Sequence, residues 1–199
     1  TILSIILIVL FSFIVGYILA RVHFKGNRAL YVMFLMGMLI PIHSLLVPIY
    51  VVFKKCGISD QWYTLLLPYV SFGLPMGIFL VEGYVKTIPV SLEEAARIDG
   101  ASTWRIFWTI IFPLMSPINA TIAILTALWA WNDFLLPLIT LTDQSNQTIP
   151  LAQYVFQSQF TSNYPMAFAS YLMAMAPVLI VYIFAQKWVV GGVMRGAVK

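Results

Sequence analysis

The charged residues of this sequence are concentrated in one short segment, Lys86 to Arg105, which contains three of the seven acidic residues and three of the basic ones. The segment carries the signals of a short helix. Pro89 precedes it, Ser91 and Glu94 have the spacing of a capping box, and Gly100 occupies the position of a left-handed C-terminal cap. Because this helix would carry both charged and small apolar side chains, it could lie on a membrane surface, insert into a partner protein or simply connect two larger elements.

Catalytic chemistry by the chain itself is not supported by its residues. A phosphate-binding loop ends in Gly-Lys-Ser/Thr, whereas the one Lys that precedes a Ser or Thr, Lys86, follows Val85. One cysteine, Cys56, and two histidines cannot build a structural zinc site unaided. The sequence also lacks a nucleophile elbow and a paired-histidine metal motif. We therefore expect no catalytic residue, metal or cofactor in this chain.

The composition places the chain in a membrane. Hydrophobic residues make up 61% of its 199 residues and charged residues 9%, whereas a soluble domain carries about 25% charged residues. Disorder is excluded as well, because disordered chains combine low hydrophobicity with high charge. The sequence predicts a polytopic helical membrane protein.

Five runs without Asp, Glu, Lys or Arg are long enough to cross a bilayer, which takes about 20 residues. Their residues do not alternate in polarity as barrel strands do. We therefore predict an all-α transmembrane bundle forming one domain, with spans near residues 2–20, 29–53, 61–81, 106–132 and 164–186. Prolines in or beside these spans are expected to kink them: Pro41, Pro48, Pro68, Pro75, Pro113, Pro117 and Pro177. Gly73 and Gly77 would allow a close helix contact.

The basic residues predict the orientation, since short cytoplasmic loops collect Lys and Arg. Lys54 and Lys55 fall on one side. The other nine fall on the opposite, cytoplasmic side: Arg21, Lys25, Arg28, Lys86, Arg97, Arg105, Lys187, Arg195 and Lys199. The segment 86–105 and the C-terminus are thus predicted to be cytoplasmic, and the loop 142–163 extracytoplasmic. The net charge of +4 becomes a signal of topology, and we expect no nucleic-acid partner.

This orientation places Thr1 outside, although no basic residue precedes the first span. A signal peptide would have its positive charges ahead of the apolar run. We expect a further transmembrane helix, the sixth, before Thr1.

The residues from Glu93 to Pro113 resemble the EAA motif of bacterial ABC importer permeases. That motif reads Glu-Ala-Ala, three residues, Gly, nine residues, Ile, one residue and Leu-Pro. Phe112 replaces the Leu, a change from one apolar residue to another. The matching residues are Glu94, Ala95, Ala96, Gly100, Ile110 and Pro113.

The resemblance implies a mechanical role for this segment. In the family, the motif helix docks in a cleft of a separate ATPase subunit and transmits its closure to the transmembrane helices. Two small alanines would permit close approach to the ATPase, and the glycine would let the chain turn sharply. The residues implied in this coupling are Glu93, Glu94, Ala95, Ala96, Arg97, Asp99 and Gly100.

Over nearly its whole length the chain also resembles the carbohydrate-uptake permeases of the maltose-transporter type, which have the type I ABC importer fold and six spans. Three segments carry this resemblance: Trp131 to Pro137, Thr148 to Leu151 and Arg195 to Lys199. In the family the tail reaches the ATPase dimer, which implies ATPase contact for Arg195, Gly196 and Lys199. The alternative is a basic tail that only holds the orientation.

The resemblance implies that this chain lies in the bacterial inner membrane and that it has several partners. They are two copies of a cytoplasmic ABC ATPase, a second permease subunit completing a heterodimer, and an extracytoplasmic solute-binding protein. ATP would be used by the ATPase, and the cargo would be a sugar or oligosaccharide. The outer loop 142–163 is polar and lacks basic residues. It would contact the binding protein, or else serve as a solvated connector with an interfacial helix near residues 151–160.

Four residues are candidates for a substrate pathway, because sugars are bound by stacking rings and by Asn or Asp hydrogen bonds: His43, Trp131, Asn132 and Asp133. An Asp at the bilayer centre costs about 2.5–3.5 kcal/mol on insertion scales, so Asp133 must lie near the outer interface or face a wet cavity. The alternatives are an interfacial anchor for Asp133 and a packing role for His43. Glu82 is expected to pair with Lys86, four residues along the same helix.

The sequence leaves a different cargo open and disfavours two other classes of membrane protein. The mechanism could be the same with an amino acid, peptide or polyol as cargo, since importers share the motif. An ion-coupled transporter is disfavoured by the lack of central acids and inverted repeats, and an intramembrane enzyme by the lack of a catalytic constellation.

Overall fold

The computed structural model of the protein describes residues 1–154 and 164–197, and every regular element within these ranges is a helix. The predicted all-α membrane architecture is confirmed. The elements are α1 (Ile2–Arg21), α2 (Asn27–Gly37), α3 (Ile42–Cys56), α4 (Leu66–Val85), α5 (Val90–Ile98), α6 (Thr103–Arg105), the π-helix η1 (Ile106–Ile111), α7 (Phe112–Leu114), α8 (Ser116–Asn132), α9 (Leu135–Thr140), the 3₁₀ helix η2 (Gln144–Asn146), α10 (Ile149–Gln153) and α11 (Tyr164–Ala197).

Three of these helices, α1, α4 and the Tyr164–Ile183 part of α11, are long and apolar enough to cross a membrane by themselves. The segments predicted as the second and fourth spans are bent pairs. Between α2 and α3 the chain turns by 92°, and between Thr103–Leu114 and α8 by 69°. Both breaks occur beside prolines, Pro41 before α3 and Pro117 in the first turn of α8, because proline cannot donate the backbone hydrogen bond that would continue a helix.

The third predicted span starts later and ends later than the apolar run 61–81. Residues 61–65 form turns, in which the Gln61 amide donates to the Thr64 hydroxyl at 2.9 Å, and α4 extends to Val85. The helix therefore includes Glu82, whose carboxylate forms the predicted ion pair with Lys86.

Helices α1 and α4 pack against each other at close range, and glycines make this possible. A Cβ added at Gly73 would overlap Ile8, and one at Gly77 would overlap Ser12. From the other side, a Cβ at Gly16 of α1 would lie 2.5 Å from Val81 Cγ1. The predicted close contact of the Gly-x-x-x-Gly pair thus exists and lies within the subunit.

The main core joins α1 and α4 to the segment that follows α5. Phe13 of α1 stacks on Phe107 of η1 with ring centroids 4.3 Å apart, and meets the edge of Phe112 at 4.9 Å. Ala96 of α5 belongs to the same buried cluster. Short α5 is therefore packed against the bundle on one face.

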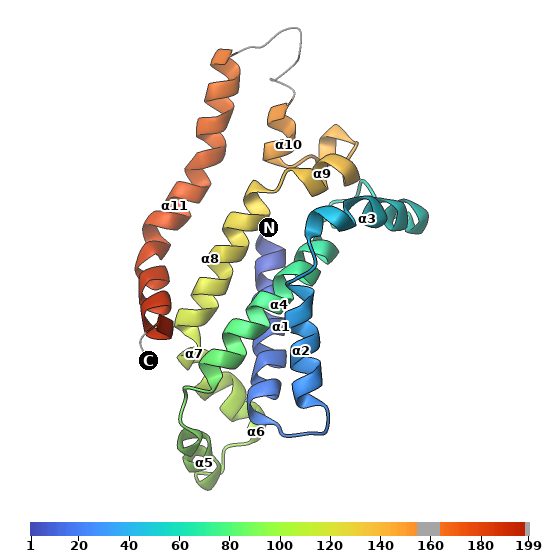
Figure 1. The fold of residues 1–199 in the computed structure, drawn as a ribbon. Helices are drawn as coiled ribbons and strands as arrows, with labels where there is room; N and C mark the ends of the chain where they lie inside the picture. The colour runs from blue at the N-terminus through green and yellow to red at the C-terminus, as the bar shows by residue number, and fades with distance from the viewer. Residues whose placement is uncertain (155–163, 198–199) are drawn as a thin grey trace.

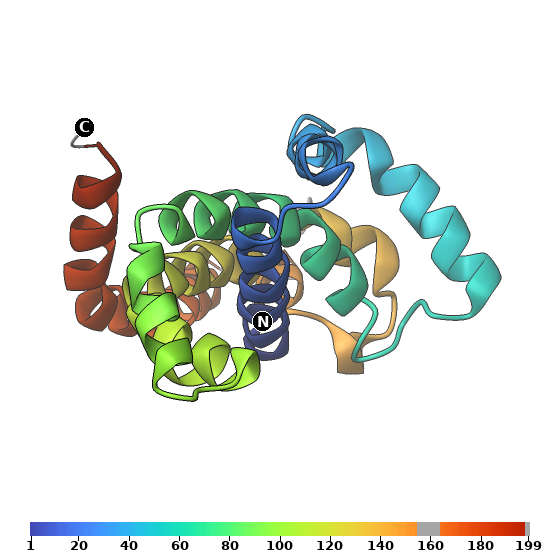
Figure 2. The same cartoon turned by 90° about the horizontal axis from the view of Figure 1, so that it is seen from below.

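Figure 1 shows how the two ends of the molecule differ. The end of α1, the short helices α5 and α6 and the C-terminal end of α11 lie toward one end, whereas α3, α9 and α10 lie toward the other. Seen from below, α5 and α6 cross the end of the bundle (Figure 2). Helix α11 runs beside α8, and only 6% of its Tyr164–Ile183 part is buried, against 39% for α1 and for α4.

Candidate functional site

The site begins with the end of α5, which is fixed by backbone geometry. Gly100 has φ of +81°, its amide donates to the Arg97 carbonyl at 3.0 Å, and the Ala101 amide donates to the Ala96 carbonyl at 2.9 Å. These two bonds form a Schellman motif, which requires a left-handed residue at the glycine position. The predicted left-handed cap at Gly100 is confirmed, and it directs the chain back toward the bundle.

The start of α5 differs from the prediction. The helix begins at Val90, with Pro89 as its N-cap residue and without a side-chain cap hydrogen bond. Ser91 therefore lies inside the first turn, two residues after the N-cap position, and the predicted capping box with Glu94 is wrong. The extended backbone of Pro89, with φ of −59° and ψ of 131°, sets the start of the helix.

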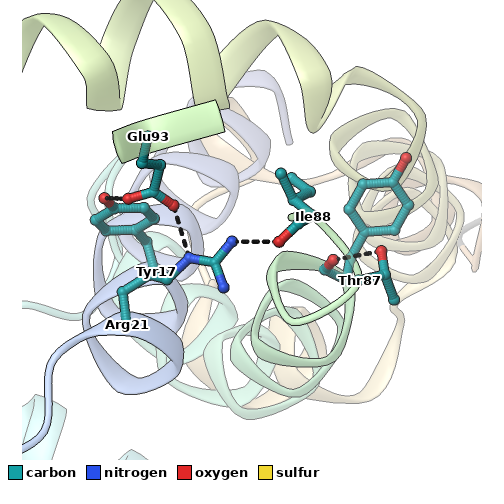
Figure 3. A network of polar contacts seen from close by, with 6 residues as sticks. Tyr17, Arg21, Thr87, Ile88 and Glu93 are labelled. Atoms are coloured by element: carbon teal, nitrogen blue, oxygen red, sulfur yellow. Dashed lines mark hydrogen bonds and ion pairs between the residues drawn. The ribbon is translucent and has the colours of Figure 1, made fainter. Parts of the chain in front are cut away.

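Glu93 is buried and is bound by two side chains of α1 (Figure 3). The Tyr17 hydroxyl donates to Glu93 Oε2 at 2.7 Å, and Arg21 Nε donates to Glu93 Oε1 at 2.6 Å. Arg21 Nη2 also donates to the Ile88 carbonyl at 2.6 Å, in the connection between α4 and α5. We call Tyr17, Arg21 and Glu93 the α1–α5 tether.

The structure places two of the predicted coupling residues on the inner side of α5. Glu93 is 3% exposed and Ala96 9%, and both face the bundle, so neither offers surface to a partner. A carboxylate is tolerated there because both of its oxygens accept hydrogen bonds and an arginine balances its charge. Tyr17 and Arg21 lie one helical turn apart at the end of the first span, and this spacing could have suggested a shared partner.

The opposite face of α5 is exposed. It combines apolar and charged side chains, which we call the outer face of α5: Leu92, Glu94, Ala95, Arg97, Ile98 and Asp99. Ile98 is 86% exposed and Leu92 44%. These two side chains leave apolar surface uncovered on the outer face of α5.

The four predicted pathway residues fall into two separate places. His43 and Asp133 line one cavity of about 70 Å³ together with Trp129, between α3 and the ends of α8 and α9. Trp131 and Asn132 line another cavity, of about 350 Å³, between α8, α10 and α11. Trp131 Nε1 donates to the Ala174 carbonyl of α11 at 3.2 Å. Neighbouring residues at a helix end point in different directions, so a sequence cluster does not make one site.

Asp60 forms a second polar cluster at the opposite end from α5, and no pattern in the sequence predicts it. It has a left-handed backbone, with φ of +59°. Its carboxylate accepts hydrogen bonds from the amide and hydroxyl of Thr142 and, at 2.9 Å, from the Asp143 amide. These bonds hold the pKa of Asp60 below its ordinary value, with the Thr142 hydroxyl as the largest cause. Asp60 thus fixes the loop after α9 to the loop after α3.

The remaining predicted residues lie at the C-terminal end. Arg195 and Gly196 are in the last turn of α11, and Lys199 lies outside the described residues. In the outer loop, α10 overlaps the predicted interfacial helix at residues 151–153, and residues 155–160 are outside the described part.

The fold is that of a helical membrane protein with bent spans and a short exposed helix at one end. A family model described as "Binding-protein-dependent transport system inner membrane component" matches residues 3–195, and the chain belongs to this family.

Individual relatives give the comparison more detail. The chain is 40% identical, over all of its length and 72% of the relative's, to the "Probable starch degradation products transport system permease protein AmyC" of Thermoanaerobacterium thermosulfurigenes. It is 38% identical, over all of its length and 73% of the relative's, to the "Multiple sugar-binding transport system permease protein MsmG" of Streptococcus mutans serotype c.

Solved structures share the fold. A chain of a bacterial ABC transporter involved in the import of the acidic polysaccharide alginate superposes with a TM-score of 0.76 at 25% identity, over 94% of this chain and 70% of that one. A chain of the inward-facing MetNI methionine ABC transporter superposes with a TM-score of 0.70 at 17% identity, over 95% of this chain and 89% of that one.

Proposed function

We propose that this chain is the permease subunit of an ATP-driven importer that moves a sugar or oligosaccharide into the cytoplasm. The cargo class is supported by relatives whose names specify starch degradation products, multiple sugars, and melibiose, raffinose and stachyose, at 36–40% identity. The mechanism is supported by one structural observation above all, the exposed outer face of α5.

The outer face of α5 would meet the ATPase. Ile98 and Leu92 offer apolar surface for burial in a cleft, and Glu94 and Arg97 flank them with charges that can fix the register of docking. Two copies of the ATPase would bind, one to this subunit and one to a second, related permease. ATP would be bound and hydrolysed by the ATPase alone.

The arrangement of the ends supports a cytoplasmic position for α5 and for the C-terminus. The segments that carry most of the basic residues lie toward the α5 end (Figure 1), as expected for the inner side of a membrane protein. The other end, with α3, α9, α10 and the Asp60 cluster, would then face the extracytoplasmic solute-binding protein. The 350 Å³ cavity beside Trp131 and Asn132 has the volume of a small-ligand site, and these two residues are our candidates for sugar contact.

The cargo is tested by ATP hydrolysis in the complete complex, reconstituted in vesicles with its binding protein. Malto-oligosaccharides, raffinose and arabino-oligosaccharides are added in turn, with amino acids, dipeptides and polyols as the comparison set. We expect at least one sugar to raise the hydrolysis rate and to be transported. Stimulation confined to the comparison set would overturn the sugar assignment while leaving the ATP-driven mechanism intact.

A further inference from the structure

The two faces of α5 have different surroundings. The outer face of α5 is exposed, whereas Glu93 on its inner face is bound by Tyr17 and Arg21 of α1 (Figure 3). Arg21 holds a second point as well, the Ile88 carbonyl at 2.6 Å. One arginine thus fixes both α5 and the connection that leads into it.

We propose that the tether transmits the movement of α5 to α1, so that the two helices shift as one unit when the ATPase closes. The proposal rests on the proposed function and names a further part of its machinery. Tyr17, Arg21 and Glu93 act as positioning residues, because they join α5 to the bundle and act on the cargo only through the helices they connect.

Directional bonds distinguish the tether from the other attachments of α5. Ala96 and Ile88 pack in the apolar core, but apolar contacts are non-directional and allow one surface to slide over another. The bond from Arg21 to Glu93 is charge-assisted and short, and the Arg21 and Glu93 side chains are only 12% and 4% exposed. A displacement of α5 along the membrane plane would be resisted by these bonds and passed on to α1.

From α1 the displacement can continue into the neighbouring helices. The contacts of Gly16 with Val81 and of Gly77 with Ser12 leave no space between α1 and α4. Phe13 is likewise stacked between elements, on Phe107 of η1. A closely packed interior transmits strain because it has few voids to absorb it. Movement of the tether is thereby coupled to α4 and to the segment that leads into α8.

The test compares conservative variants in the complete transporter, with its ATPase, second permease subunit and binding protein in vesicles. Glu93→Gln and Arg21→Gln remove the ionic bond, and the double variant Arg21→Gln/Glu93→Gln removes both partners. Tyr17→Phe deletes one hydroxyl and keeps the ring that packs against Phe107 at 5.0 Å. The control is Glu82→Gln, since Glu82 is also buried, at 6% exposure, but its carboxylate pairs with Lys86 and lies beside Tyr31 of α2, outside the tether.

Three quantities are measured: ATPase copurification, ATP hydrolysis and the amount of sugar imported per ATP, using the best-transported member of the sugar panel. We expect Glu93→Gln and Arg21→Gln to keep the ATPase bound and hydrolysing while import per ATP falls about tenfold, within the usual range of coupling between sites. Tyr17→Phe should show a smaller fall. The double variant should be no worse than either single one, because both cut the same connection.

Three results would overturn the proposal: unchanged import per ATP in Glu93→Gln, an equal fall in the Glu82→Gln control, or loss of ATPase binding in Glu93→Gln, which would make Glu93 a direct contact. The proposed function fails differently. In that case the wild-type complex itself shows no ATP-driven sugar import.

Discussion

The Tyr69 hydroxyl on α4 donates a hydrogen bond to Asp133 Oδ2 at 2.9 Å, just beyond the end of α8. Tyr69 is 2% exposed, and its ring also meets Trp129 in an edge-to-face contact at 5.2 Å. The cavity that Asp133 shares with His43, about 70 Å³, is far below the roughly 300–1,000 Å³ of small-ligand sites. In this conformation Asp133 joins two helices and does not line a space for a sugar.

Replacing Tyr69 by Phe should therefore weaken the bundle. A hydrogen bond to a charged group contributes about 1.5–3 kcal/mol, and this one lies in a largely buried site. We expect the purified complex to unfold at a lower temperature. Tyr63→Phe is the control, since Tyr63 is 39% exposed, and an equal loss in both variants would contradict the structural role of the Tyr69 bond.

The contact between α1 and α4 gives a second prediction. Gly77→Ala would place a Cβ against Ser12, and overpacking of this kind costs about 1–3 kcal/mol. Gly83→Ala on the same helix meets nothing within 4 Å and should be neutral or slightly stabilising, because alanine favours helices. Thermal unfolding of the two variants side by side measures the difference. Equal stability would show that α1 and α4 do not approach as closely as described.

The Asp60 cluster predicts a local dependence on pH. A carboxyl group whose pKa is lowered by folding stabilises the folded loop above its ordinary pKa, and this stabilisation is lost as pH falls through the lowered value. We expect the Thr142 and Asp143 amides to stay protected from hydrogen exchange at neutral pH, and to lose protection only as the pH falls below the ordinary Asp pKa of about 3.9.

Asp60→Asn tests the same cluster at neutral pH by raising exchange at residues 142 and 143. Asp143→Asn is the matched control, because the Asp143 side chain caps the Ser145 amide at 2.9 Å and its effect should be confined to residue 145. Unchanged exchange at residues 142 and 143 in Asp60→Asn would refute the role of Asp60 in holding this loop.

Gly100 is expected to be needed for the grip on the ATPase. At φ of +81° a β-branched residue is strained, so Gly100→Val should distort the end of α5 and reduce ATPase copurification while membrane insertion continues. Gly57→Val is matched to it: Gly57 has φ of +69°, ends α3, and like Gly100 has open space where a Cβ would go. Equal copurification from the two variants would count against a coupling role for α5.

The sequence was sufficient for those features that depend on neighbours along the chain. The apolar run 2–20 corresponds almost residue for residue to α1. Gly100 has the left-handed backbone of a helix cap, and Glu82 forms an ion pair with Lys86, four residues further along the chain. Prolines marked the breaks near Pro41 and Pro117, although the size of the bends depends on packing.

Contacts between distant segments could not be predicted in this way. Glu93 and Glu94 are adjacent acidic residues on one helix, and only the structure shows that Glu93 is buried and Glu94 exposed. Glu93 is the buried one of the two because it binds Tyr17, which is 76 residues away in the chain. Likewise, the separation of Asp133 from Trp131 follows from their partners Tyr69 on α4 and Ala174 on α11.

The central claim is that this subunit imports a sugar using ATP hydrolysed by a partner. The most direct measurement is uptake of labelled sugar into vesicles that contain the complete transporter and are arranged so that ATP can reach the ATPase. The same uptake is measured in vesicles that lack the ATPase and in vesicles that lack the binding protein. We predict uptake that requires ATP, the ATPase and the binding protein together, and that survives collapse of the proton gradient. Uptake driven by a proton gradient in vesicles without the ATPase would contradict the account.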